Sequence, residues 1–177
     1  MKNALKLDNV NWANAFIREY KDQLNPEMRN DIASYCTALL AFHDRKIEQA
    51  NDILCGLNFS EDFAYHLEFR VLLIKTYYER CCLNEIDLES HLINYELEAM
   101  RQHVSTRNKK LAEPLRQAYN NFVNGFKRIL ERKKKLQAKQ IINSTQLNKL
   151  REELSTLSPL VERDWLMEKV EGLVEEG

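Results

Sequence analysis

Glycine and proline are scarce in this chain, and this scarcity restricts its fold more than any other feature of the sequence. Only four Gly and three Pro occur in 177 residues. Sandwiches and barrels need many turn residues, whereas long helices need few. The apolar residues Val10, Ala13, Ile17, Tyr20 and Leu24 are three or four positions apart, as on one face of a helix. The sequence therefore predicts an all-α protein.

Polar residues and helix-breaking residues between the apolar stripes mark the expected helix ends. Gly56 is the expected stop of one helix. Residues 103–110 form the expected loop, and a long helix follows that runs toward Lys139. The expected N-caps are Asn9, Asn25 before Pro26, Ser60, Asn84, Asn143 and Ser158 before Pro159. Because the expected turns are short, neighbouring helices should run antiparallel.

A weak internal repeat runs through the first half of the chain. Val10, Ile47 and Ile86 each open an expected helix, and they are 37 and 39 residues apart. The first two are each followed three positions later by an alanine, which is small enough to let two helices approach closely. The segment Phe42 to Ala50, F-H-D-R-K-I-E-Q-A, resembles the turn and second-helix start of a tetratricopeptide repeat. In that family an aromatic residue ends the first helix and a short turn follows.

This resemblance implies antiparallel helical hairpins in a right-handed tetratricopeptide-like superhelix. The repeat-like region covers about residues 9–102, so the expected domains are hairpins over 1–102 and a long basic helix with capping helices over 103–177. We expect the two parts to form one continuous structural unit. Since the chain starts at what would be the second helix of a pair, a piece of a longer array is the open alternative.

Motifs typical of enzymes, metal sites and nucleotide sites are absent from the sequence. No two His residues have the spacing of a zinc protease, and Cys81 and Cys82 are adjacent instead of spaced as C-x-x-C. No glycines lie close enough together for a phosphate-binding loop. We therefore expect a non-enzymatic protein with no catalytic residue, no metal and no cofactor.

Two further observations indicate the compartment. The longest aliphatic run, Val71 to Ile74, is far shorter than the roughly 20 residues that cross a bilayer. The four cysteines lie within helical patterns, which indicates buried or half-buried thiols in a reducing compartment. We expect a cytoplasmic protein with no membrane contact.

Charge is strongly segregated along the chain. Residues 1–100 carry 10 Lys and Arg against 17 Asp and Glu, a net charge of −7, and residues 101–139 carry 12 against 2, a net charge of +10. The helix over 127–139 is therefore either an electropositive face for a polyanion or a solvated helix end that faces acidic neighbours. Because the whole chain carries only −1, nucleic acid is the less favoured partner. The candidate polyanion-binding residues are Lys127, Arg128, Arg132, Lys133, Lys134, Lys135 and Lys139.

The expected second and fourth helices supply candidate peptide-binding residues. The apolar stripe of the second consists of Ile32, Tyr35, Cys36 and Leu39. Tetratricopeptide domains that bind a C-terminal carboxylate have Lys and Asn there, so this stripe favours an apolar or aromatic peptide instead. The fourth helix is apolar nearly all round, and its two cations would contact a peptide or pair with a nearby carboxylate. The candidate residues are Tyr35, Arg70, Lys75 and Tyr78.

Together these patterns predict a protein-binding scaffold. Its partner is a protein or peptide that the sequence does not identify, and a homo-oligomer is one form that such binding could take. The alternative is binding of nucleic acid or another polyanion through the helix over 127–139.

Overall fold

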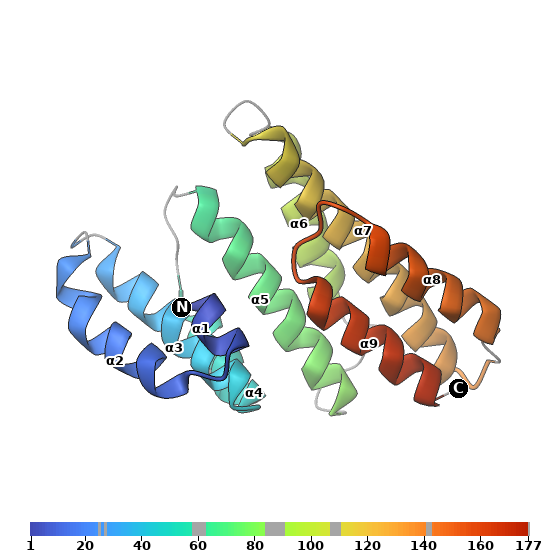
Figure 1. Cartoon of the computed structure of the whole chain (residues 1–177), viewed down its shortest axis with the longest axis horizontal. Helices are drawn as coiled ribbons and strands as arrows, with labels where there is room; N and C mark the ends of the chain where they lie inside the picture. The colour runs from blue at the N-terminus through green and yellow to red at the C-terminus, as the bar shows by residue number, and fades with distance from the viewer. Residues whose placement is uncertain are drawn as a thin grey trace. The chain divides into compact units, whose positions relative to one another are not determined.

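The described residues of the chain fold mainly into helices (Figure 1). The computed structural model describes residues 1–24, 26, 28–57, 63–83, 91–106, 111–140 and 143–176. All regular elements in these ranges are helical, which confirms the predicted all-α class. The helices are α1 (Lys2–Lys6), α2 (Val10–Tyr20), the 3-10 helix η1 (Lys21–Gln23), α3 (Arg29–His43), α4 (Ile47–Cys55), α5 (Phe63–Cys82), α6 (His91–Thr106), α7 (Glu113–Gln137), α8 (Ser144–Thr156) and α9 (Arg163–Glu176).

Several predicted helix ends are confirmed. The side-chain oxygen of Asn9 accepts a hydrogen bond from the Trp12 N–H at 3.2 Å and so caps α2. The Asn143 oxygen accepts from the Thr145 N–H at 2.8 Å and caps α8. Gly56 is the C-cap of α4, as predicted. The predicted caps Asn25, Ser60 and Asn84 lie outside the described residues.

Other predicted boundaries are wrong. Residues 103–106, predicted as loop, continue α6, while 107–110 lie outside the described part of the chain. The long helix α7 ends at Gln137, and Lys139 follows it in a left-handed conformation with φ 54°. Pro26 precedes α3 by more than a first turn, since that helix begins at Arg29. The short helix α1 was not predicted at all.

The last helix also begins later than predicted, at Arg163 instead of Ser158 and Pro159. Two side chains donate hydrogen bonds to backbone carbonyls of the segment that precedes α9. The Asn121 amide donates a hydrogen bond to the Pro159 carbonyl at 2.8 Å, and the Arg163 guanidinium donates to the Leu157 carbonyl at 2.5 Å. These bonds satisfy carbonyl groups that a helix would otherwise use.

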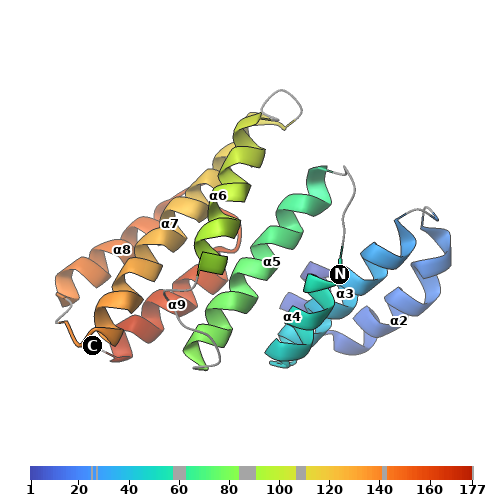
Figure 2. The ribbon, with the colours of Figure 1, turned by 180° about the vertical axis from the view of Figure 1, so that it is seen from behind.

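The structure divides into two compact units, Met1–Glu96 and Leu97–Gly177. In unit 1, helices that are consecutive in sequence are in contact from α2 to α5 (Figures 1 and 2). The turn 44–46 between α3 and α4 is only three residues long, so these two helices run antiparallel. The middle of α5 is buried on all sides, since consecutive residues from Val71 to Ile74 are buried, which agrees with its apolar sequence.

Unit 2 is organised around α7. The buried rings of Phe122 and Phe126 lie 6.0 Å apart, and the Trp165 ring of α9 lies 5.5 Å from that of Phe126. Gly125 leaves room for the Leu154 side chain of α8, because a Cβ atom at this position would lie 2.8 Å from one of its methyl carbons. Within the described residues, no helix of either unit is both long and apolar enough to cross a membrane.

Candidate functional site

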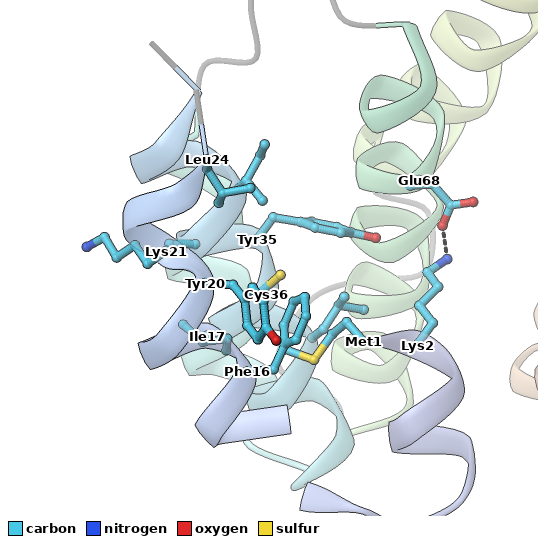
Figure 3. A pocket seen from close by; sticks show the side chains of 13 residues that line it. Met1, Lys2, Phe16, Ile17, Tyr20, Lys21, Leu24, Tyr35, Cys36 and Glu68 are labelled. Carbon is cyan, nitrogen blue, oxygen red and sulfur yellow. Dashed lines mark ion pairs between the residues drawn. The ribbon is translucent and has the colours of Figure 1, made fainter. Parts of the chain in front are cut away.

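An apolar groove of about 350 Å³ lies in unit 1. Its walls come from α2 and α3, from η1 and the residue after it, from the start of α1 and from one residue of α5, as Figure 3 shows. Most of the side chains that form it are aliphatic or aromatic. The lining residues are Met1, Lys2, Phe16, Ile17, Tyr20, Lys21, Leu24, Ile32, Ala33, Tyr35, Cys36, Leu39 and Glu68.

The groove exists because two apolar stripes meet without sealing each other. Ile17, Tyr20 and Leu24 come from the first predicted stripe, and Tyr35 and its neighbours on α3 come from the second. A pair of helices normally buries such stripes in its interface. Here Ala13 is the only buried residue of α2, so the larger side chains of that helix remain partly open to solvent.

An aromatic ladder of Trp12, Phe16 and Tyr20 runs along α2, and Phe16 and Tyr20 also line the groove. The ring of Phe16 stacks against Trp12 at 4.9 Å and against Tyr20 at 4.8 Å between ring centroids. Both outer members are exposed, Trp12 at 46% and Tyr20 at 44% of their surface. Stacked rings are stiff and carry much apolar area, which is typical of surfaces that bind other proteins.

Charged groups mark the edge of the groove nearest α5. The Lys2 ammonium forms an ion pair with the Glu68 carboxylate, drawn as a dashed line in Figure 3. Within the groove lining, burial raises the pKa of the Cys36 thiol, and the nearby amino group of Met1 offsets part of this effect. Glu68 provides an acidic group in an otherwise mostly apolar lining.

The structure separates the four predicted peptide-binding residues. Tyr35 lines the groove, whereas the other three lie on α5 and do not line it. The Arg70 guanidinium donates to the Glu96 carboxylate at 2.5 Å, which is the ion-pair alternative considered from the sequence. The Lys75 ammonium lies 5.0 Å from the Phe42 ring centroid, and Tyr78 is buried. Their role in peptide binding remains a prediction.

The predicted polyanion-binding residues occupy the second half of α7 and the turn that follows it. Arg128 forms an ion pair with Glu153 of α8, and Arg132 donates to the Arg128 carbonyl at 2.9 Å. Lys135 and Lys139 are exposed. The half-buried members of the set are Lys127, Arg128, Arg132, Lys133 and Lys134. Arg128 is thus held by an acidic partner within the chain.

A second, more polar cleft of about 470 Å³ lies in unit 2 around this ion pair. The hydrogen bond from Arg128 holds the pKa of Glu153 below its ordinary range. Burial and the adjacent Arg128 cation lower the pKa of Arg132. Arg128 is therefore already engaged by a carboxylate of the chain. The cleft is lined by Asn121, Asn124, Gly125, Arg128, Glu153, Leu154, Thr156, Leu157 and Ser158.

Metal ligands do not gather in the part of the chain that the structure describes, where no group of three or more His, Cys, Asp or Glu side chains could hold an ion. The cysteines are less buried than predicted, because Cys55 and Cys82 are exposed while Cys36 is half-buried and Cys81 buried. Cys55 and Cys82 lie at helix ends, where the spacing of apolar residues does not predict whether a side chain is buried.

Sequence reasoning missed six residues of the groove, namely Met1, Lys2, Phe16, Lys21, Ala33 and Glu68. Phe16 adjoins the predicted stripe and carries a helical i, i+4 signal with Trp12 and Tyr20, while Lys21 and Ala33 each follow a stripe residue directly. Met1, Lys2 and Glu68 are brought to the groove only by folding. The chain matches no protein-family model, no curated protein and no solved structure. Interpretation of the groove therefore depends on its own chemistry.

Proposed function

We propose that this chain is a non-enzymatic protein-binding module that holds an apolar or aromatic segment of a partner in the groove of unit 1. One observation carries this proposal: an open groove of about 350 Å³ has a largely apolar lining and lies beside an exposed aromatic ladder. Leaving such a surface in water is unfavourable, and exposed apolar patches commonly mark interaction sites. A second copy of this chain is one partner that could cover it.

The proposed architecture is a tetratricopeptide-like superhelix over residues 9–102, with the later helices as its cap. The proposal is supported by the short turn between α3 and α4 and by the contacts between consecutive helices of unit 1. It is also supported by Ala13 and Ala50, which are fully buried at positions equivalent in the repeat pattern. A cytoplasmic location is part of the same proposal.

Placing a charge in the wall of the groove tests the function. We expect Ile17→Glu to weaken capture of partner proteins by the full-length chain at least about tenfold, because a bound apolar segment would have to bury an unpaired carboxylate. Ile17 is only partly buried, so the variant should still fold. The measurement is quantitative affinity capture from cells of the native source, with each recovered protein compared between variant and parent.

Leu92→Glu is the matched control. Leu92 is an exposed apolar residue of α6 that does not line the groove, so its substitution introduces the same charge elsewhere in unit 1. Partners that use the groove should be retained by this control and lost with Ile17→Glu. Equal recovery by both variants would contradict the proposed binding surface.

Polyanion binding through the helix over 127–139 is the second candidate function. The observation that favours it is the exposure of Lys135 and Lys139 at the end of α7, next to the half-buried Lys133 and Lys134. The ion pair between Arg128 and Glu153 speaks against it, since a phosphate would have to compete with that carboxylate.

Neutralising three adjacent lysines tests this second candidate. We expect the combined variant Lys133→Gln, Lys134→Gln, Lys135→Gln to change the free energy of unfolding by no more than about 1 kcal/mol, because none of the three is fully buried. Any binding of polyuridylate at low salt should disappear. Unchanged binding by the variant, or no binding by the parent at low salt, would exclude this helix as a polyanion site.

A further inference from the structure

Met1 and Lys2 form one side of the groove. The Met1 side chain is part of the lining and reaches toward Phe16, while Lys2 turns to Glu68 on α5 (Figure 3). Lys2 is the first residue of α1, which is only five residues long, and Met1 is its N-cap. This side of the groove therefore presents an apolar side chain followed directly by a cation.

The contact that holds Lys2 against α5 is weak. The Lys2 and Glu68 side chains are 34% and 32% exposed, so their ion pair is screened by water. A helix of this length has almost no stability of its own. Leu5, the only buried residue of α1, follows Lys2 by three positions and anchors the helix. The Lys2 side chain can consequently turn away from Glu68 while Leu5 stays packed.

Glu68 favours a particular charge in a ligand that displaces Lys2. It is the only carboxylate among the lining residues that the structure describes, and it borders an otherwise apolar surface. A charge-assisted hydrogen bond at such a border is stronger than the same bond in open water. A ligand that displaces Lys2 gains most if it brings its own cation to this carboxylate. A ligand with an acidic group there would be repelled.

We propose that Met1 and Lys2 form a displaceable side of the groove, and that the partner segment which displaces them carries an apolar side chain next to a lysine or arginine. The inference rests on the proposed function, because it takes the groove to be a protein-binding surface. Lys2 competes with the partner for Glu68, and the ion pair between them limits access to the groove.

The test uses the full-length chain and two synthetic amphipathic helical peptides with leucines at the same positions. Each leucine is followed by lysine in one peptide and by glutamate in the other, and dissociation constants are measured by calorimetry. We expect the parent to prefer the lysine peptide by about two- to fivefold, the range of a partly exposed ion pair. Lys2→Ser should tighten binding of this peptide by a similar factor.

Variants of Glu68 test whether this carboxylate causes the preference for the lysine peptide. Glu68→Gln should abolish the preference, and Glu68→Lys should reverse it. The matched control is Glu48→Gln, which removes an exposed carboxylate of α4 that does not line the groove. It should leave the preference unchanged, since any contribution from the overall negative charge of this region is spread over many groups.

Displacement of Met1 and Lys2 can be followed without a ligand. Cys36 lines the groove and is half-buried, so its alkylation rate reports access. We expect Lys2→Ser to raise the alkylation of Cys36, measured by peptide mass spectrometry, relative to that of the exposed Cys55 in the same sample. An unchanged ratio would show that Lys2 does not restrict the groove and would overturn the inference.

The outcomes separate this inference from the proposed function. If both peptides bind equally, or if Glu68→Gln leaves their ratio unchanged, the charge preference is wrong while the groove remains a binding surface. If Ile17→Glu leaves peptide binding unaffected, or if neither peptide binds any variant, the groove is not a protein-binding site and both proposals fail.

Discussion

Phe126→Ala should lower the free energy of unfolding of unit 2 by about 3–5 kcal/mol, the range measured when a buried aromatic ring is removed. Phe126 has no exposed surface and lies between the rings of Phe122 and Trp165. Its removal would leave a cavity where helices α7 and α9 meet and would also remove two aromatic contacts. The neighbouring rings are themselves tightly packed, so they cannot move far enough to fill the space.

Urea denaturation followed by circular dichroism measures this change. Leu115→Ala is the control, because Leu115 lies on the same helix but is 41% exposed. We expect this substitution to change the unfolding free energy by no more than about 0.5 kcal/mol. A loss of similar size in both variants would show that the rings near Phe126 do not form the core of the unit.

The second large effect concerns the ion pair between α5 and α6. We expect Glu96→Ala to lower the unfolding free energy of unit 1 by about 2–4 kcal/mol, because it leaves the Arg70 guanidinium mostly buried without this carboxylate. The Arg70 and Glu96 side chains are only 22% and 10% exposed. Burial raises the pKa of Glu96 although Arg70 acts against this, so the fold resists the carboxylate charge even when it is paired.

Replacing both members of this pair should have a much smaller effect than replacing one. In Arg70→Met with Glu96→Leu no charge remains to be desolvated, and apolar side chains of similar volume fill the same space. We expect the double variant to recover most of the loss, as measured by urea denaturation of both variants and the parent. A double variant that is less stable than Glu96→Ala would contradict the idea that the unpaired charge causes the loss.

The sequence predicted the helical class and those helix ends that depend on local chemistry. Asn9, Asn143 and Gly56 act within one turn of their own positions, so their roles could be inferred from the residues nearby. The late start of α9 is accompanied by hydrogen bonds from Asn121 and Arg163 to the preceding segment, and Asn121 is distant in sequence. No local signal could reveal that contact.

The groove was predictable only in part. Apolar spacing identified the stripes that contain Ile17 and Tyr35, but spacing does not show whether two stripes seal each other or leave a space between them. That outcome depends on how closely α2 approaches α3. The pairing of Lys2 with Glu68 joins residues far apart in sequence, and nothing in either segment indicated it. The pairing of Arg70 with a carboxylate was anticipated as an alternative, without the identity of Glu96.

The placement of the two tryptophans makes the protein its own spectroscopic reporter. Trp12 belongs to unit 1 and is nearly half exposed, whereas Trp165 belongs to unit 2 and is buried. Their fluorescence emission should therefore differ in wavelength, with the Trp165 component blue-shifted and less accessible to iodide quenching. Because Trp12 stacks on Phe16, filling the groove should alter the red component alone, and unfolding of unit 2 should shift the blue one.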